Sequence, residues 1–413
     1  MAQINITLNQ DEILQLLSGN REDAFKELLQ NSLNSILKAE STEQLKAQPY
    51  ERTDNRKGSR NGTRERTLNT RLGSITLKVP KHRDGVPFKT LIFDNYSRSE
   101  AALVISMAEM VVNGVSTRKV SNVMETLCGT SFSKSSVSEA CKELDEQVEA
   151  FSIHPLEKSY PFVTMDATYF KVREKHRVIA KAFMIAYGTD EYGHREILGF
   201  EAYANESKDT WKQFLQSLKK RGLKDVLMFT SDAHEGIIYA INKVYPNVPW
   251  QRCQFHFSKN ITDKVPKKYQ TGVRSELQEM FQCSTMKAAR KKKDEIIADY
   301  KDIAESAMTC LDEGFESAMT VMSLPHYWRK YFRTSNHIER INKELKRRSR
   351  VIGIFPNEES LIRLMGSVLI ELNSGLNTRR SIFTNKTYKE LISSDIPIKL
   401  TKIAVEQKNL LVA

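Results

Sequence analysis

The sequence predicts an α/β protein whose central region forms a mixed β-sheet, with helical segments before it and after it. Three strand-like runs follow one another directly, which is typical of antiparallel hairpins. Two more strand-like runs follow, and a helical run precedes each of them. Helical crossovers of this kind join parallel strands. The strand-like runs cover residues 161–172, 177–187, 196–204, 226–232 and 250–257, and the helical runs cover 207–221 and 234–245.

The charge of the chain favours a polyanionic partner. The 413 residues carry a formal net charge of +12, and the pI is about 9.3. Nucleic acid is the commonest polyanion that proteins bind, although a basic protein without such a partner is the plain alternative. The length predicts two to four domains, and the 40% hydrophobic content supplies buried cores.

The sequence carries no sign of secretion, membrane insertion or nucleotide binding. The five cysteines show no disulfide spacing, and we find no signal peptide and no apolar run that could span a bilayer. We therefore expect a reducing, cytoplasmic setting and no membrane contact. The run 129–135 lacks the second glycine of a phosphate-binding loop, so no nucleotide cofactor is expected.

The first part of the chain is expected to be mainly helical, with a basic loop and a hairpin. Apolar residues recur at three- and four-residue spacing over 9–47, which predicts helices. Residues 51–64 are polar and rich in Arg, Gly and Asn, which predicts an exposed loop. Alternation over 67–79 predicts a hairpin around Gly73 that Pro80 ends.

Residues 97–150 predict a compact unit of three helices. Capping-box patterns begin at Ser97 and Ser136, and Gly114 and Gly129 are expected helix stops. The spacing suits a helix-turn-helix whose last helix enters a major groove, but a small bundle without DNA contacts has the same pattern. The three helices are expected near 98–113, 116–127 and 136–150.

The second half of the chain is expected to be helical. Residues 258–325 lack strand signals and are rich in Lys, Glu, Ala and Met, which predicts an all-helical insertion. The very basic run 329–350 and the apolar run 357–373 have helical periodicity, and Asn357 is the expected cap of the second. The tail, 376–413, carries no informative pattern.

Three carboxylates lie at positions where a role in metal binding is a better explanation than packing. Asp166 interrupts an apolar strand-like run, Asp232 ends another, and Glu339 lies on the basic helix. Carboxylate oxygens suit Mg²⁺, and two divalent ions can assist both the nucleophile and the leaving oxygen in phosphodiester chemistry. Glu344 is the rival on the same helix, but it lies off the face that Glu339 shares with Asn342 and could simply pair with neighbouring Arg or Lys.

Several motifs in order resemble the IS256 family of bacterial transposases, kin of the Mutator elements. The likeness runs from about residue 50 to about 375, which makes it specific. The motifs are RNG at 60–62, TRLGS at 70–74, VP at 79–80, MDATY at 165–169, SDAHEG at 231–236, CQFH at 253–256, NHIERINKE at 336–344 and RRSRVIGIFPN at 347–357.

The resemblance implies an RNase H-like core with a DDE triad and a helical insertion between the second Asp and the Glu. Carried over by position, Asp166, Asp232 and Glu339 would be the catalytic residues and the ligands of Mg²⁺ or Mn²⁺, with two ions expected. The family implies metal-dependent 3′ strand cleavage at terminal inverted repeats, then strand transfer through a circular copied intermediate. The rivals are an RNase H-like nuclease or resolvase that never joins ends, and a non-catalytic DNA-binding regulator.

Four residues near the triad have two interpretations each. Cys253 and His256 resemble half of a zinc site without a second pair, so packing beside the active site or DNA contact is the alternative. His234 could position a phosphate or water, or it could cap a helix. Trp328 could stack on an unpaired base or pack in the core.

The expected partner is double-stranded DNA, comprising transposon ends and target, bound by a homodimer because two ends must be brought together. The expected DNA-binding residues are Arg56, Lys57, Arg60, Arg64, Arg66, Lys134, Arg340, Lys343, Lys346, Arg347 and Arg348. The expected domains are an N-terminal helical region (1–50), a DNA-binding region (51–150), the first part of the core (151–257), the insertion (258–328), the final core helices (329–376) and the tail (377–413).

Overall fold

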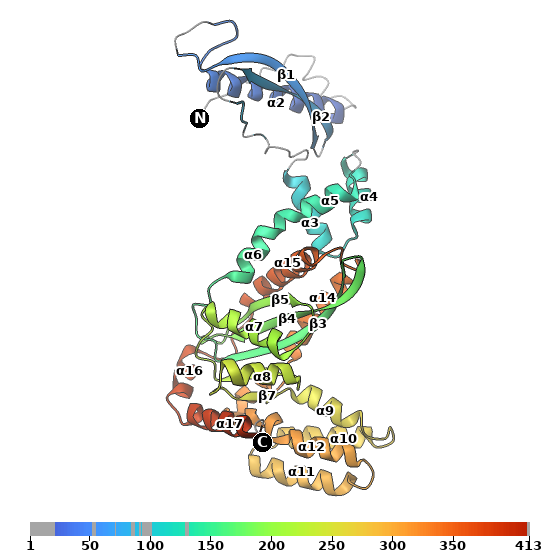
Figure 1. The fold of residues 1–413 in the computed structure, drawn as a ribbon, viewed down its shortest axis with the longest axis vertical. Helices are drawn as coiled ribbons and strands as arrows, with labels where there is room; N and C mark the ends of the chain where they lie inside the picture. Colours follow the sequence, from blue (N-terminus) through green and yellow to red (C-terminus); the bar gives the residue numbers. More distant parts are fainter. Residues whose placement is uncertain are drawn as a thin grey trace. The chain divides into compact units, whose positions relative to one another are not determined.

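The computed structural model describes residues 21–51, 55–70, 72–83, 87–90, 92, 101–128 and 132–410. The chain divides into two units, Met1–Glu143 and Leu144–Ala413 (Figure 1). A search of the described helices finds none long and apolar enough to cross a membrane.

A long helix and a two-stranded hairpin form one part of the first unit. Helix α2 (Arg21–Leu45) packs on strand β2 (Gly73–Arg83), which pairs antiparallel with β1 (Ser59–Thr70). Alternate side chains of β2 from Ile75 to Val79 are buried, because successive residues of a strand point to opposite faces. The buried face joins α2 in a small apolar core.

The hairpin is confirmed, and it is longer than the sequence predicts. Strand β1 begins at Ser59, inside the run predicted as a loop, and β2 continues past Pro80 to Arg83. Thr63 lies opposite Pro80 beside a register shift, where the missing N–H of proline is tolerated. Part of the predicted first helix, residues 9–20, lies outside the described residues, as does Ser97.

Short helices complete the first unit. Helices α3 (Ala101–Val112) and α4 (Thr117–Cys128) confirm two of the predicted helices, and they share a core with α5 (Lys134–Ala140). The third predicted helix is instead broken into α5, the 3₁₀ turn η1 (Cys141–Leu144) and α6 (Asp145–Ile153), which belongs to the second unit. The cap of α5 is Ser133 and not Ser136, because the Ser133 hydroxyl accepts from Ser136 N.

A five-stranded mixed sheet is the centre of the second unit, as the sequence predicts. Its strand order is β5-β4-β3-β6-β7, with antiparallel pairing from β5 to β3 and parallel pairing from β3 to β7. The bounds are Phe162–Glu174 for β3, Arg177–Thr189 for β4, Arg195–Tyr203 for β5, Met228–Ser231 for β6 and Trp250–Arg252 for β7.

Helices cover both faces of this sheet (Figure 1). On one face, α7 (Lys208–Lys220) and α8 (Glu235–Val244) bury Trp211 and Ile237 against Met165 and Phe229. On the other face lie α6, α14 (Asn336–Ser349) and α15 (Glu358–Asn377). Asn357 caps α15 as predicted, since its side chain accepts from Ser360 N.

The segment between β7 and α14 is helical throughout its regular structure, as the sequence predicts. Its helices α9 (Gln254–Thr262), α10 (Gln270–Gln282), α11 (Met286–Tyr300) and α12 (Glu305–Ala318) surround a separate apolar core that includes Phe257. The predicted strand at 250–257 is wrong beyond Arg252, because Cys253 is the N-cap residue of α9, which begins at Gln254. The short η2 (Thr320–Ser323) and α13 (His326–Phe332) lead back to the sheet.

The tail contains two helices for which the sequence carries no informative pattern. They are α16 (Asn385–Ile392) and α17 (Ile396–Leu410). Tertiary contacts hold them: Phe383 stacks on Trp328 at 4.3 Å between ring centroids, and Gln407 Nε2 donates to Trp250 O at 2.8 Å. Such contacts are not visible in local sequence patterns.

Candidate active site

Adjacent parallel strands place Asp166 and Asp232 level with each other. Thr164 of β3 pairs with Thr230 of β6, and each aspartate lies two residues further along its own segment. Paired residues of neighbouring strands leave the same face of a sheet, and the strands are about 4.8 Å apart. Met165 is buried under α7 and α8, so Asp166 points to the opposite face, toward α14.

The Asp166 carboxylate is partly buried and accepts two hydrogen bonds. Oδ1 accepts from Ala167 N at 2.9 Å, and Oδ2 accepts from Asn342 Nδ2 at 2.7 Å. The pKa of Asp166 is raised to about 7, first by burial and then by the charge of Asp232, with a smaller contribution from Glu339. The three carboxylates therefore share one electrostatic environment, which a cation would relieve.

Helix α14 presents both Glu339 and Asn342 to this environment. Ile338, Ile341 and Leu345 of the same helix are buried and fix its orientation. Glu339 and Asn342 are three residues apart and therefore lie on one helix face. Ser335 Oγ donates to Glu339 Oε1 at 3.2 Å.

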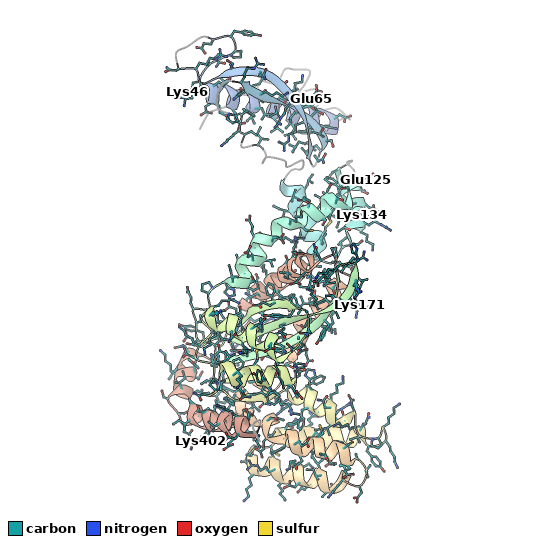
Figure 2. All side chains as sticks on the ribbon, viewed as in Figure 1. Lys46, Glu65, Glu125, Lys134, Lys171 and Lys402 are labelled. Atoms are coloured by element: carbon teal, nitrogen blue, oxygen red, sulfur yellow. The ribbon has the colours of Figure 1, made fainter. Side chains whose placement is uncertain are left out.

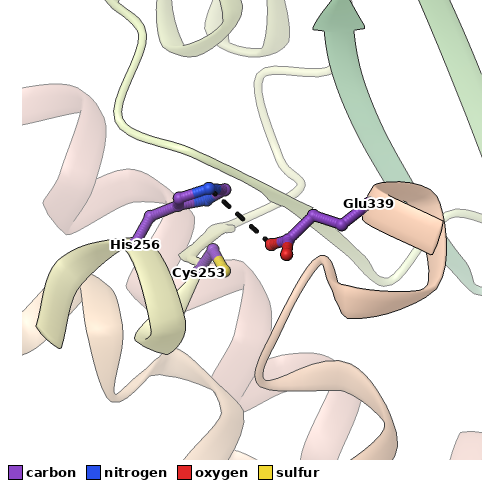
Figure 3. Close-up of side chains that lie close together, drawn as sticks. All are labelled: Cys253, His256 and Glu339. Atoms are coloured by element: carbon purple, nitrogen blue, oxygen red, sulfur yellow. Dashed lines mark ion pairs between the residues drawn. The ribbon is translucent and has the colours of Figure 1, made fainter. Parts of the chain in front are cut away.

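His256 and Cys253 lie at the start of α9, next to Glu339 (Figure 3). His256 Nε2 is 3.7 Å from Glu339 Oε1. The buried Cys253 Sγ accepts from Ser335 N at 3.3 Å and lies 3.1 Å from Ser335 Oγ. These contacts place the Cys253–His256 pair beside the acidic site.

The electrostatics of this pair favour a charged imidazole. Hydrogen bonding to Cys253 is the main cause that raises the pKa of His256 to about 9, and the charges of Glu339 and Asp166 add to it against the opposing effect of burial. Burial raises the pKa of the Cys253 thiol, but hydrogen-bonding groups of His256 and Ser335 lower it overall. At neutral pH His256 therefore faces Glu339 as a cation.

One group of metal-type ligands is preassembled within the described part of the chain. Cys253 Sγ, a ring nitrogen of His256 and a carboxylate oxygen of Glu339 all lie within 4.8 Å of one another. The group offers three side chains, whereas structural zinc takes four ligands, and neither Cys283 nor Cys310 belongs to it. Glu339 therefore points toward His256, and the three acidic residues do not form a ligand group as compact as Cys253, His256 and Glu339.

The acidic residues nevertheless fit a divalent ion that prefers oxygen ligands. Asp166 and Asp232 supply carboxylate oxygens, and their mutual repulsion is expressed in the raised pKa of Asp166. Asn342 Oδ1 is buried and has no hydrogen-bond partner among the described residues. Carboxylate and amide oxygens are the donors that Mg²⁺ and Mn²⁺ accept.

Comparison with known proteins decides the family. A family model described as "Transposase, Mutator family" matches residues 1–377. The chain belongs to the Mutator family of transposases. The transposase for insertion sequence element IS256 in transposon Tn4001 of Staphylococcus aureus is 42% identical over 379 residues, which cover 90% of this chain and 96% of that relative.

Other relatives agree with the IS256 resemblance, which is thereby confirmed. The transposase for insertion sequence element ISRM5 of Rhizobium meliloti is 40% identical over 349 residues, covering 84% of this chain and 87% of the relative. The transposase for insertion sequence element IS1081 of Mycobacterium tuberculosis is 36% identical over 351 residues, covering 84% of each chain. The likeness therefore spans both units of this Mutator-family member.

Glu344, the rival acidic residue, is engaged elsewhere in this family member. Its carboxylate accepts two hydrogen bonds from Arg347, at 2.7 and 2.6 Å, and one from Arg348 at 2.8 Å. Hydrogen bonding to Arg347 is the main cause that lowers the pKa of Glu344 to about 2. The local pairing considered for Glu344 is the arrangement found.

Trp328 and His234 take the structural alternatives that the sequence leaves open. Trp328 is 1% exposed and packs on Phe383, so its ring is not available to a base. His234 caps α8, since its Nδ1 accepts from Gly236 N at 3.1 Å. The same nitrogen lies 3.4 Å from Glu206 Oε1, and a ring nitrogen that accepts cannot also donate to that carboxylate.

The predicted DNA-binding residues of this family member fall into two groups. Arg56 and Arg60 donate to backbone carbonyls within the first unit, and Arg348 is 5% exposed and bonded to Glu344 and Glu371. Arg347 is exposed but paired with Glu344, and Arg66 is half-buried. The exposed members are Lys57, Arg64, Lys134 (Figure 2), Arg340, Lys343 and Lys346.

Sequence reasoning missed two contributors to the site. Asn342 is noted only as sharing a helix face with Glu339, yet it donates to Asp166. Ser335 contacts both Cys253 and Glu339, since its N–H donates to the sulfur and its hydroxyl donates to the carboxylate. The three-residue spacing from Glu339 is a signal for Asn342, whereas nothing in the local sequence marks Ser335.

Proposed function

We propose that this chain is a DDE transposase that cleaves the 3′ strand at the terminal inverted repeats of an insertion sequence and transfers it to target DNA. The observation that supports this proposal is that Asp166 of β3 and Asp232, which directly follows β6, lie level with each other and close to the helix that bears Glu339. Membership of a transposase family and the net charge of +12 support it.

The sheet supports an RNase H-like core as the scaffold of this reaction. Three antiparallel strands are followed by two parallel strands with helical crossovers, and Asp166 lies on the central strand while Asp232 directly follows the neighbouring one. The helical segment between β7 and α14 is the proposed insertion domain. The domain boundaries given from the sequence remain part of this proposal.

Asp166, Asp232 and Glu339 would hold Mg²⁺ or Mn²⁺, with two ions proposed. When bound, such ions supply charge stabilisation at the attacking and leaving oxygens of a phosphodiester exchange. The chain's own residues prepare this site. Asn342 fixes the orientation of the Asp166 carboxylate, and Ser335 fixes that of Glu339. Outer contacts of this kind commonly set the orientation of metal ligands.

Cationic side chains of α14 and α9 would draw the DNA backbone toward the acidic residues. Arg340, Lys343 and Lys346 are exposed on the helix that carries Glu339. His256 carries a proton at neutral pH and faces Glu339, where it offsets part of the negative charge. We propose that the protein acts as a homodimer on two element ends, through a circular copied intermediate.

Substitutions that replace each of the three carboxylates with the uncharged amide of the same size test this function. The substrate is a labelled duplex made from the DNA that flanks the gene, where terminal inverted repeats are expected. Asp166→Asn, Asp232→Asn and Glu339→Gln are expected to retain DNA binding and to lose both cleavage and joining in Mg²⁺. Glu235→Gln is the matched control, because its exposed carboxylate follows Asp232 by three positions.

Each outcome of this assay has a definite meaning. Full cleavage by any of the three variants would reject the triad. Cleavage by the wild-type protein without joining would identify a nuclease or resolvase. Specific DNA binding without any cleavage, unchanged by the substitutions, would identify a regulator.

A further inference from the structure

A cavity of about 540 Å³ opens beside the acidic site, within the second unit. Gln254 and Phe255 line one wall, and they lie between Cys253 and His256 at the start of α9. Arg333 also lines it, on the segment that leads into α14 and Glu339. A hydrogen bond from Gln254 N to Arg333 O, 3.0 Å long, joins these two segments. The cavity therefore adjoins the elements that hold Glu339.

The cavity has an excess of positive charge. Lys259, Arg274 and Arg333 line it, against the single carboxylate of Asp263. Among the described residues, none of the three cations forms an ion pair with a carboxylate, in contrast to Arg347 and other paired cations on the same unit. Unpaired guanidinium and ammonium groups are suited to bind phosphate oxygens.

An exposed aromatic ring accompanies these cations. Phe255 is 49% exposed at the cavity, although its neighbour Phe257 is fully buried in the helical core. Its ring is 5.6 Å from that of His256, so it lies next to the acidic site. A solvent-facing aromatic beside cations is the combination that binds unpaired bases, by stacking on the base while the cations contact the backbone.

We propose that this cavity holds one unpaired nucleotide of the DNA strand being processed, with its base on Phe255 and its phosphates on Arg274, Lys259 and Arg333. The volume falls in the range of about 300–1,000 Å³ that is typical of small-ligand sites. This inference rests on the proposed function, since it assigns the cavity to the same DNA strand. Buried Trp328 cannot take this role, and Phe255 replaces it as the stacking residue.

The first test compares two duplexes of one sequence, one blunt and one with an unpaired tail of five nucleotides. Binding of the full chain is measured by fluorescence anisotropy in EDTA, so that no strand is cut. The wild-type protein is expected to prefer the tailed duplex about tenfold, because stacking on an aromatic side chain contributes at this level. Phe255→Ala is expected to remove the preference and to leave blunt-duplex affinity unchanged.

Two control variants separate stacking from general damage. Phe255→Trp is expected to retain the preference, and Tyr192→Ala is expected to leave it intact. Tyr192 is the matched control, because its ring is also 49% exposed but lies in the β4–β5 turn. An abasic tail is expected to bind the wild-type protein and Phe255→Ala equally, which a merely structural role of Phe255 would not produce.

The cations are tested through salt dependence on the tailed duplex. Arg274→Gln and Lys259→Gln are each expected to reduce the slope of log affinity against log salt concentration by about 0.7. If the wild-type protein shows no tail preference, or if Phe255→Ala keeps it, the cavity is not a nucleotide site. Strand cleavage that is lost in Asp166→Asn would still support the proposed function in that case, so the two failures are distinguishable.

Discussion

Asp166 is the carboxyl group of the site whose pKa is raised by burial and by the neighbouring negative charges. Burial and the charge of Asp232 raise its pKa from the ordinary value of 3.8 to about 7. A folded state that keeps this proton while the unfolded chain has lost it becomes less stable as pH rises through that window. The sign is the opposite of that for a carboxylate held by a salt bridge.

The raised pKa of Asp166 predicts how the stability of the metal-free protein depends on pH. In EDTA, the free energy of unfolding of the wild type minus that of Asp166→Asn is expected to fall as pH rises from about 4 to about 7. The comparison is made as a difference because burial lowers the pKa of His337 to about 4, which contributes with the opposite sign in both proteins. At pH 8 the variant is expected to be more stable than the wild type by about 1–3 kcal/mol, and at pH 4 the two are expected to be equal. Urea unfolding at fixed pH values measures both.

Asp302→Asn serves as the control for this prediction, because Asp302 is exposed in the loop between α11 and α12. Its pH profile is expected to match that of the wild type. A difference in unfolding free energy between the wild type and Asp166→Asn that stays constant between pH 4 and 7 would contradict the account of Asp166.

Asn342 offers a second prediction at the residue scale. Its Nδ2 donates to Asp166 Oδ2 at 2.7 Å from a buried position on α14. Asn342→Ala is expected to reduce strand cleavage by about 10- to 100-fold with DNA affinity unchanged, because the carboxylate loses the group that orients it. Asn242→Ala is the control, since Asn242 bonds only the Ile238 carbonyl of its own helix.

At the scale of elements, one contact decides what Trp328 does. Trp328 of the short helix α13 contacts Phe162 of β3 and Phe383 of the tail. The rings of Trp328 and Phe383 are stacked, with 4.3 Å between their centroids. The ring therefore joins a central strand to a segment that the sequence leaves unassigned. The cluster holds α16 against the sheet together with its local signals, which are a capping box between Thr384 and Thr387 and the buried pair Tyr388 and Leu391.

Trp328→Ala is accordingly expected to destabilise the second unit. The free energy of unfolding is expected to fall by about 3–5 kcal/mol, the cost of emptying a large buried site. Tyr327→Ala, whose ring is 58% exposed, is expected to cost less than about 1 kcal/mol. A Trp328→Ala protein that unfolds normally but binds single-stranded DNA more weakly would instead support stacking on a base.

The segment around Cys253 shows how tertiary structure overrides a local pattern. Apolar residues from Trp250 onward predict a strand as far as Phe257, but β7 ends at Arg252. Phe257 is buried among the insertion helices, where only a helical turn can direct it. The same switch from strand to helix places His256 against Glu339.

At the scale of the whole molecule, some basic side chains are exposed and can contact DNA, whereas others are buried or paired with carboxylates. Lys343 and Lys346 are exposed beside the acidic site, whereas Arg348 is buried between Glu344 and Glu371. Counting basic residues along the sequence treats these side chains as equivalent. The structure separates cations that can release counterions from cations that hold the fold together.

Salt dependence can measure this separation. The double variant Lys343→Gln/Lys346→Gln is expected to lower the salt slope of duplex affinity by about two, with the free energy of unfolding unchanged. Lys402→Gln on α17 is the control and is expected to leave the slope intact (Figure 2). Arg348→Gln is expected to lower the free energy of unfolding by about 2 kcal/mol, because the hydrogen bonds of a buried guanidinium to Glu344 and Glu371 are lost, although Glu344 keeps Arg347. A reduced slope in Arg348→Gln without loss of stability would contradict this division.

The sequence by itself determined the order of strands and helices along the chain, the mixed character of the sheet, the helical segment that follows it, and Asp166, Asp232 and Glu339 as candidate residues. These features depend on periodicity and on acidic residues interrupting apolar runs, both of which are local properties. Only the tertiary structure decided that Asn342 bonds Asp166, that Trp328 and Arg348 are buried, and that Phe255 is exposed at a cationic cavity. Those outcomes depend on which distant segments pack together, since burial and pairing are set by neighbours in space.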